Sequence, residues 1–324
     1  MQAKARALPG RLNDVDLRLL RVFKAVADCG GLSAAELELD IAVSTISRHI
    51  KDLEERLGLV LCRRGRSGFA LTPEGEKLYL ATEQLLSATE AFRGSLHEIH
   101  RGLGGELHVA MFEKTATNPQ SRIAHAVAQF RERAPAVSLH LHVGTIAMIE
   151  RGVMNGQFQL GIVPEHRRSD SLVYDELFDE TMRLYAGSTH PWFQPRRRAP
   201  GWADLRDQSL AALGFHSPNM MLAHEHRLER QATASDQEAV ATLVLSGCFL
   251  GFLPDHYADG FVRDGRMRAV APETLNYRCR FCCVHRRVPA LSRVAESFRG
   301  ALLDSHRAVR KAASSRGPLI SEKR

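Results

Sequence analysis

The segment STISRHIKDLEERL, residues 44–57, decides the fold of the N-terminal part of this chain. Its apolar residues Ile46, Ile50, Leu53 and Leu57 recur at intervals of three and four, which predicts an amphipathic helix. On an isolated helix the polar face would be ordinary solvated surface, so its role depends on what flanks it. That face carries Ser44, Thr45, Arg48, Lys51 and Asp52.

The residues before this segment predict two further helices. Apolar residues recur at helical spacing over 16–27, and Cys29-Gly30-Gly31 ends that helix. Ser33 and Glu36 are spaced as a capping box, which predicts a short second helix that begins at Ser33 and ends near Leu39. Two helices joined by a tight turn, the second longer and amphipathic, are typical of a helix-turn-helix.

A recognition helix reads bases in the major groove through its N-terminal residues. Arg48 can present its guanidinium to guanine, and Ser44 and Thr45 can reach base edges. Lys51, one turn later, is better placed for a phosphate. The predicted DNA-binding residues on the helices are Ser33, Ser44, Thr45, Ser47, Arg48 and Lys51.

Residues 58–71 continue this pattern with two short apolar runs around an arginine- and glycine-rich turn, as in a two-stranded wing. Arg63, Arg64 and Arg66 are expected to grip the DNA backbone or to enter the minor groove. Thr72-Pro73 then predicts the start of a new helix, with threonine as its cap and proline at the first helical position.

The helix after the wing is expected to run to about His100. Leu78, Leu85, Phe92 and Ile99 recur along it every seven residues, which predicts a coiled-coil linker that joins two subunits. Such a dimer would place two recognition helices on one face of DNA and match a two-fold operator.

The stretch from Leu17 to Leu80 resembles the DNA-binding domain of LysR-type transcriptional regulators, in GGLSAAELEL, ISRHIKDLEERLGLVL and ALTPEGEKL. The family commonly begins its recognition helix with Ser-Gln-Pro, where this chain has Ala42-Val43-Ser44. The usual cap and a glutamine that often contacts bases are therefore absent, and the helix start is expected at Ser44. The resemblance implies a homodimer or homotetramer that binds double-stranded DNA, with RNA polymerase as a further partner.

The C-terminal two-thirds alternate strands and helices, which predicts a largely parallel sheet. Strands are expected at 107–111, 137–143, 160–163, 182–186, 249–253 and 277–284, with helices at 119–133, 145–155, 236–246 and 292–303. Looser similarity to the effector domain of the same family implies two α/β lobes like those of periplasmic binding proteins, joined by two crossovers. The similarity extends to about residue 305.

The expected organisation is an α+β and α/β multidomain chain. It comprises a flexible tail (1–13), a winged helix-turn-helix (14–72), a linker helix (73–103), an effector-binding domain (104–305) and a flexible basic tail (306–324). Within the effector domain, lobe I is expected at about 104–177 and 278–305, and lobe II at about 178–277.

Ligands of such folds bind between the lobes, near strand ends and helix starts, where free N–H groups favour a carboxylate or another anion. Ser235 and Thr145 can equally be plain helix caps, and His216 can be an ordinary loop histidine. The candidate effector residues are Thr115, Thr117, Gly144, Thr145, Pro164, Phe215, His216, Ser235 and Asp236.

Composition limits the other functional classes. The net charge of +7 lies mostly after residue 286, so bulk charge alone does not indicate DNA binding. The 15 histidines are scattered and predict no metal site, and Cys279, Cys282 and Cys283 are interpreted as buried strand thiols, with a redox role as the alternative. No apolar segment suits a secretion signal or a membrane helix, so we expect a cytoplasmic protein without membrane partners.

Two other functions were weighed against a ligand-responsive regulator. An enzyme built on the α/β domain lacks support, since the sequence shows no Gly-rich phosphate loop, no GxSxG, no HExxH and no telling carboxylate pair. We therefore expect no catalytic residues and no cofactor. An architectural DNA-binding protein without an effector is favoured only by the basic tail.

Overall fold

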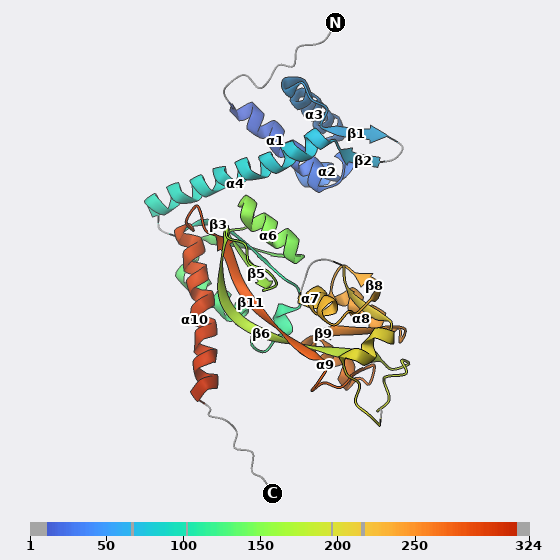
Figure 1. The fold of residues 1–324 in the computed structure, drawn as a ribbon. Helices are drawn as coiled ribbons and strands as arrows, with labels where there is room; N and C mark the ends of the chain where they lie inside the picture. Colours follow the sequence, from blue (N-terminus) through green and yellow to red (C-terminus); the bar gives the residue numbers. More distant parts are fainter. Residues whose placement is uncertain (1–11, 66–67, 102, 196, 215–217, 316–324) are drawn as a thin grey trace. The chain divides into compact units, whose positions relative to one another are not determined.

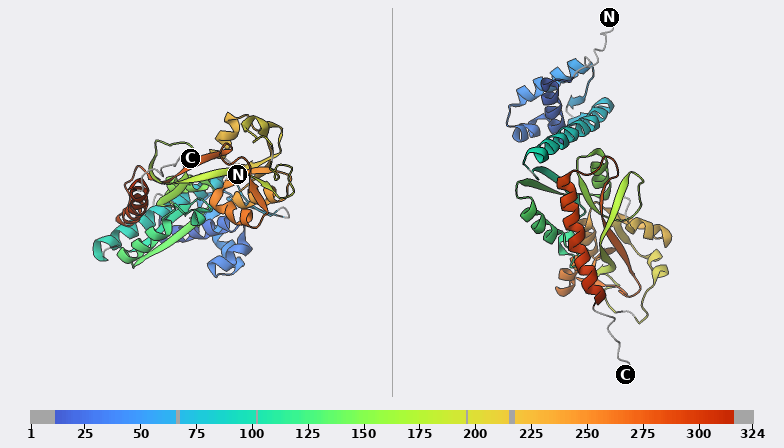
Figure 2. Two further views of the ribbon diagram at one scale, coloured as in Figure 1. Left: turned by 90° about the horizontal axis from the view of Figure 1, so that it is seen from below. Right: turned by 90° about the vertical axis from the view of Figure 1, so that its left-hand side faces the viewer.

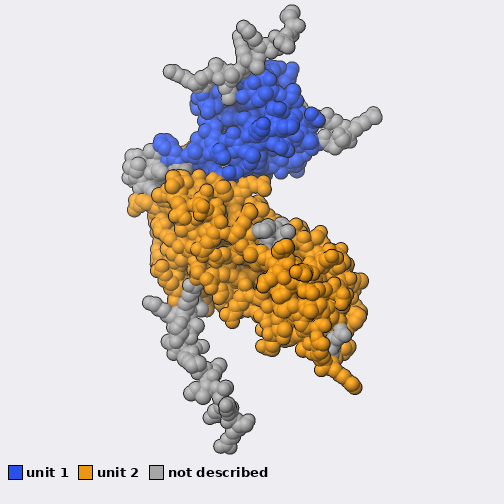
Figure 3. Space-filling view, in the orientation of Figure 1, with its two compact units in different colours: residues 1–92, 155–157 blue, residues 93–154, 158–324 orange. Residues whose placement is uncertain are grey.

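The computed structural model describes residues 12–65, 68–101, 103–195, 197–214 and 218–315. The chain divides into two compact units, the first comprising Met1–Phe92 with Asn155–Gln157 and the second the remainder (Figure 3). Within the described ranges, no helix combines the length and the apolar character needed to cross a membrane.

The first unit contains the predicted helix-turn-helix and wing (Figure 1). Buried apolar side chains from its helices meet in one core, which includes Leu19, Phe23, Ile46, Ile50 and Leu53. Its elements are α1 (Asp14–Asp28), α2 (Leu32–Leu39), α3 (Val43–Leu57), the antiparallel strands β1 (Cys62–Gly65) and β2 (Gly68–Leu71), and α4 (Pro73–Arg101).

Helix α1 begins at Asp14, two residues earlier than expected, because Asn13 and Asp16 form a reciprocal capping box. The side chain of Asn13 accepts the N–H of Asp16 at 3.1 Å, and Asp16 accepts the N–H of Asn13 at 3.1 Å. The buried Asp16 carboxylate also receives the Nε–H of Arg56 at 2.8 Å, which ties the start of α1 to the end of α3.

The capping box predicted at Ser33 is wrong. Helix α2 begins at Leu32 with Gly31 as its cap residue, so Ser33 already lies inside the helix and is exposed. The Glu36 carboxylate instead accepts the backbone N–H of Val43 at 3.1 Å. It therefore satisfies a free donor at the start of α3, where Ala42 has no side chain that could cap.

The second unit is built on one nine-stranded sheet in the order β4-β3-β5-β11-β6-β9-β7-β8, with β10 paired to β6. The expectation of a largely parallel sheet is wrong at its centre, where β11 runs antiparallel to β5 and β6, and β6 runs antiparallel to β9. The strands are β3 (Gly105–Met111), β4 (Val137–Val143), β5 (Leu160–Pro164), β6 (Leu172–Gly187), β7 (Leu210–Leu213), β8 (Arg230–Ala234), β9 (Leu250–Pro254), β10 (Met267–Ala269) and β11 (Asn276–Arg286).

The two long strands β6 and β11 are the crossovers between two lobes (Figure 1). Lobe I holds the parallel strands β3, β4 and β5, and lobe II holds the parallel strands β7, β8 and β9. The helical elements of this unit are η1 (Thr115–Thr117), α5 (Ile123–Arg133), α6 (Ile146–Asn155), η2 (Trp202–Asp207), α7 (Pro218–Glu225), α8 (Gln237–Leu245), α9 (Asp255–Arg263) and α10 (Arg293–Ser315).

Helices α5 and α10 lie side by side on lobe I (Figures 1 and 2), with the rings of Phe130 and Phe298 packed edge to face at 5.2 Å. Helix α5 begins at Ile123, later than the expected residue 119. The N–H of Arg122 donates to Nε2 of His306 at 2.9 Å, and His306 is buried. Helix α10 thus continues past residue 305, where the sequence predicts a flexible tail; residues 316–324 lie outside the described part.

The three cysteines of β11 are buried, as expected for strand thiols. The register of β11 against β6 shifts between Phe281 and Cys282. Cys279 packs in a core of lobe II, whereas Cys282 and Cys283 pack in a larger core that continues through both lobes. Burial raises the pKa of Cys282 to about 12 and also raises the pKa of Cys279 well above the ordinary range, which makes both thiols poor nucleophiles.

Candidate functional site

The exposed face of α3 forms a polar surface in the first unit. Ile46, Ile50 and Leu53 are buried, which turns Ser44, Arg48 and Lys51 toward solvent. The remaining two predicted residues of this helix, Thr45 and Ser47, are half-buried. The helix starts at Val43, one residue before the expected position, so the predicted base-reading residues occupy its first two turns.

The wing is held against α3 by a side chain that the sequence reading did not single out. Oε1 of Glu54 accepts the backbone N–H of Leu61 at 2.7 Å and that of Cys62 at 3.3 Å. Leu61 is fully buried, and the strand that follows leads directly into the arginines. Glu54 therefore fixes the position of the wing relative to the recognition helix.

The arginines of the wing lie partly on a strand rather than in the turn. Arg63 and Arg64 belong to β1 and pair with Ala70 and Phe69 of β2. The side chain of Arg63 is exposed. The side chain of Arg64 and the whole of Arg66 lie outside the described residues, so their predicted contacts with DNA stay predictions.

Thr72 joins the wing to α4. Its hydroxyl donates to the carbonyl of Val60 at 2.7 Å and accepts the N–H of Gly75 at 3.0 Å, which makes it the expected helix cap. A Cβ added at Gly75 would collide with the carbonyl oxygen of Leu61. A side chain is therefore excluded at this position, which explains the glycine of the ALTPEG segment.

The heptad residues of α4 do not share one environment. Leu78 and Leu85 are half-buried against the core of the helix-turn-helix itself. Phe92 is 64% exposed, and the side chain of Ile99 lies outside the described part of the chain. The repeat thus serves the intramolecular core in its first half, which the sequence reading did not anticipate. A dimer contact through Phe92 stays a prediction.

Among the predicted effector residues, Thr117 makes a contact across the boundary between the lobes of the second unit. Thr115 is buried, and the hydroxyl of Thr117 lies 2.8 Å from Nδ1 of His256 in lobe II. Nε2 of His256 lies 2.9 Å from Oε1 of the buried Glu180 on crossover strand β6. Neither His256 nor Glu180 was identified from the sequence, because only the folded chain brings them beside Thr117.

Two further contacts join the lobes across this boundary. Nζ of Lys114 donates to Oε2 of Glu238 at 2.7 Å and lies 4.5 Å from the centre of the Tyr257 ring. The N–H of Gln237, the first residue of α8, donates to Oε1 of Glu113 at 2.6 Å. Burial raises the pKa of the Glu113 carboxyl, and the N–H of Gln237 partly offsets that shift.

Several predicted effector residues are occupied by local structure. Asp236 caps α8 by accepting the N–H of Ala239 at 2.8 Å, and the hydroxyl of Ser235 donates to Asp236 at 3.0 Å. The hydroxyl of Thr145 accepts the N–H of Met148 at 3.3 Å, as a cap of α6 does. Gly144 directly follows β4, and its N–H donates to a backbone carbonyl of the neighbouring strand β3. Phe215 and His216 lie outside the described residues.

A cavity of about 20 Å³ lies between the lobes, and among the described residues Pro164 is the one predicted effector residue on its wall. This volume corresponds to about one water molecule, whereas small-molecule sites commonly measure roughly 300–1,000 Å³. The amide oxygen of Gln237 is buried on this wall and has no hydrogen-bond partner among the described atoms. The wall comprises Phe112, Ile146, Pro164, Glu180, Met182, Leu213, Pro218, Gln237, Tyr277 and Cys279.

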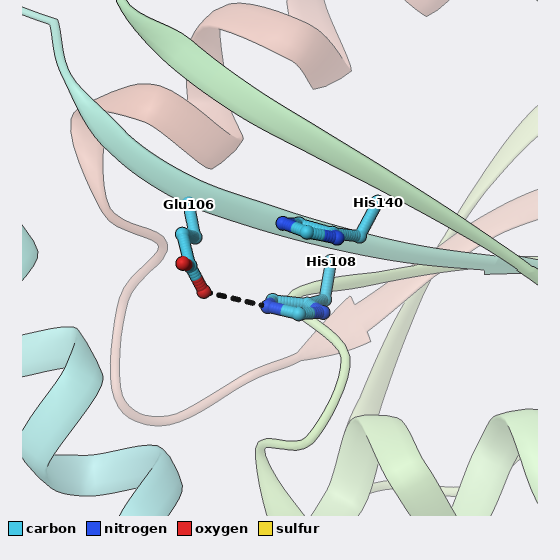
Figure 4. Close-up of side chains that lie close together, drawn as sticks. All are labelled: Glu106, His108 and His140. Carbon is cyan, nitrogen blue, oxygen red and sulfur yellow. Dashed lines mark hydrogen bonds and ion pairs between the residues drawn. The ribbon is translucent and has the colours of Figure 1, made fainter. Parts of the chain in front are cut away.

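Histidines that are scattered along the sequence come together in lobe I. Glu106 and His108 of β3 lie beside His140 of β4 (Figure 4), and the nearest donor atoms of the three lie within 4.8 Å of one another. His142 joins them, with its Nε2 3.3 Å from Nδ1 of His108. The parallel register of β3 and β4 produces this cluster, and sequence alone does not specify a register.

Comparisons with known proteins agree with both units. Residues 17–76 match the family model described as "Bacterial regulatory helix-turn-helix protein, lysR family". Residues 100–307 match the family model described as "LysR substrate binding domain".

Individual relatives span nearly the whole chain. The HTH-type transcriptional activator BauR of Pseudomonas aeruginosa is 39% identical over 294 residues, which are 89% of this chain and 95% of that protein. The crystal structure of CbnR, a LysR family transcriptional regulator, is 20% identical, with a TM-score of 0.63 over 90% of this chain and 99% of that one. Full-length CbnR complexed with its target DNA gives a TM-score of 0.61 at 20% identity, over 89% and 99% of the two chains.

Proposed function

The chain belongs to the LysR family of transcriptional regulators, and we propose that it activates transcription from a two-fold operator in response to a small polar effector. The exposed polar face of α3, held beside a wing, carries this proposal. Arg48 reads a base, Ser44 and Thr45 lie at the end of the helix that enters the groove, and Lys51 and Arg63 contact phosphates. Ser33 and Ser47 complete the contact surface.

The name of BauR, an activator, supports activation rather than repression. We propose a homodimer, or a tetramer formed from two dimers, because one subunit supplies a single recognition helix to a two-fold site. An activator of this kind also needs a contact with RNA polymerase. The chain performs no catalytic step in this account.

The effector enters between the lobes. A cavity of about 20 Å³ admits no ordinary ligand, so the lobes separate on binding and the contacts Lys114–Glu238 and Glu113–Gln237 break or rearrange. Effector binding would favour the separated arrangement of the lobes. This change would in turn alter the arrangement of the subunits.

The chemistry of the wall restricts the effector. The N–H of Gln237 at the start of α8 is taken by Glu113, so an anionic effector group must displace that carboxylate. The unpaired amide oxygen of Gln237 favours an effector with an N–H or O–H donor, because an unsatisfied buried acceptor costs roughly 1–3 kcal/mol. We therefore infer a small molecule with a donor beside any anionic group.

Two steps test this function. The full-length chain is first used to select genomic DNA fragments at moderate salt, and enrichment of a two-fold site is expected. A reporter driven by that site then screens small polar molecules. Tight, salt-sensitive binding without enrichment would favour an architectural protein, and an enriched site that no molecule affects would remove the effector part of the proposal.

The variant Gln237→Leu tests effector binding independently of DNA binding. It should bind the operator normally but require at least about tenfold more effector. The exposed Gln194→Leu is the matched control and should respond like the parent chain. An unchanged response in Gln237→Leu would place the effector elsewhere.

A further inference from the structure

From the cluster formed by Glu106, His108 and His140, we infer a binding site for one divalent transition-metal ion, of which Zn²⁺ is the reference case, on strands β3 and β4 of lobe I. Two imidazoles and one carboxylate are a ligand set that zinc accepts, with a fourth position open to water or another group. This site lies apart from the cavity between the lobes, whose wall contains none of its residues.

The backbone already places the three ligands on one side of the sheet. His108 and His140 are direct partners in the parallel pairing of β3 and β4, so both side chains project from the same face. Glu106 precedes His108 by two residues on β3 and therefore shares that face. Figure 4 shows the carboxylate directed toward His108 and the two imidazoles lying one against the other.

The distances are compatible with one shared ion. Oε2 of Glu106 lies 3.2 Å from Nε2 of His108, and the ring centres of His108 and His140 lie 4.4 Å apart. Ligand atoms on a tetrahedral zinc ion lie roughly 3.3 Å from one another. The donor atoms lie within 4.8 Å of one another, so side chains must rotate to reach the spacing of a tetrahedral site. The side chains of Glu106 and His140 are exposed and can rotate.

His142 supplies the outer contact that metal-bound histidines commonly make. When Nε2 of His108 faces the ion, Nδ1 keeps the proton and can donate it to Nε2 of His142, which lies 3.3 Å away. The ring of His142 is in turn held against the buried Phe158, with 5.0 Å between ring centres. This contact accommodates the tautomer of His108 that offers Nε2 to a metal.

The position of His108 is also fixed through its backbone. The side-chain oxygen of Gln159 accepts the N–H of His108 at 2.7 Å, and the N–H of Gln159 donates to the carbonyl of His108 at 2.9 Å. His108 therefore lies on β3, which has a neighbouring strand on each side, whereas His140 lies on β4 at the edge of the sheet. A bound ion would cross-link the edge strand to its neighbour.

Titration of the tag-free, chelator-treated full-length chain with Zn²⁺ tests the site. Calorimetry should give one ion per chain, and Zn²⁺ should raise the midpoint of thermal unfolding because the ion binds only the folded site. His140→Gln and Glu106→Gln should each weaken binding by at least about tenfold, and loss of the outer partner in His142→Leu should weaken it about 10- to 100-fold.

The exposed His224→Gln is the matched control, since it removes a histidine outside the cluster and should bind Zn²⁺ like the parent chain. Glu106→Gln alters a side chain that is 54% exposed, so its effect does not depend on a change of fold. Failure to bind one Zn²⁺ per chain would overturn the inference. So would binding that His140→Gln and Glu106→Gln leave unchanged, because the ion would then lie on other histidines or on thiols.

Discussion

Oε1 of Glu54, on the recognition helix, lies 2.7 Å from the backbone nitrogen of Leu61 and accepts its hydrogen bond. Since Leu61 directly precedes the wing, one carboxylate connects the two elements that are proposed to contact DNA. The same oxygen also accepts the N–H of Cys62, so one side chain satisfies two backbone donors.

Replacing Glu54 by alanine should loosen the wing. Two backbone N–H groups would lose a charged acceptor, and the first unit should be destabilised by about 1–3 kcal/mol. Hydrogen exchange of residues 17–72, followed by mass spectrometry, measures this effect in the full chain. Glu55→Ala is the control, since Glu55 makes only an exposed pair with Lys51 and should change stability by less than about 0.5 kcal/mol.

Gly75→Ala should destabilise the first unit by about 1–3 kcal/mol, because the added Cβ would collide with the Leu61 carbonyl and push the wing away from α4. Gly300→Ala in α10 offers the opposite case, since a Cβ there meets nothing within 4 Å. It should stabilise the second unit by roughly 0.4–1 kcal/mol. Thermal unfolding of both variants checks the pair, and equal effects would contradict the close packing assigned to Gly75.

Phe92→Glu should weaken the dimer while the fold of the monomer is retained. Phe92 is 64% exposed in the single chain, so a charge there costs little unless a second subunit covers it. Sedimentation velocity at several concentrations measures the change. Leu85→Glu is not an equivalent test, because Leu85 packs in its own domain and the charge should unfold that domain first. Unchanged association of Phe92→Glu would exclude Phe92 from the contact.

The sequence predicted elements that carry a clear period. The apolar stripe of α3 was correct at Ile46, Ile50 and Leu53, and strand 137–143 matches β4 at both ends. Short elements such as β7, with four residues, were missed because they are too brief to show a period. The N-terminal part of β6, before residue 182, was missed because polar residues interrupt its apolar run.

Contacts distant in sequence account for the other differences. His306 at the start of α5 and the histidine cluster depend on tertiary packing or on strand register. No local pattern encodes such contacts. The candidate DNA surface could be named in advance because one helix carries most of it. The interlobe contacts between Thr117, His256 and Glu180 could not, since they join three separate elements.

Arg48→Ala should cost about 1–3 kcal/mol at the specific operator and should relax the preference at one base pair of each half-site. Lys51→Ala should instead weaken binding about equally on all sequences and lower the salt dependence by about one charge. The contrast arises because a guanidinium on the exposed N-terminal half of α3 can reach base edges, whereas an ammonium one turn later is expected to meet phosphate.

Selection from a pool of randomised DNA duplexes, run in parallel with the parent chain and with Arg48→Ala, tests the central claim most directly. The account predicts a two-fold consensus for the parent chain, and loss of discrimination at one symmetric pair of positions for Arg48→Ala. The same consensus with undiminished discrimination in both selections, or no consensus for the parent chain, would contradict the assignment of α3 as the helix that reads DNA.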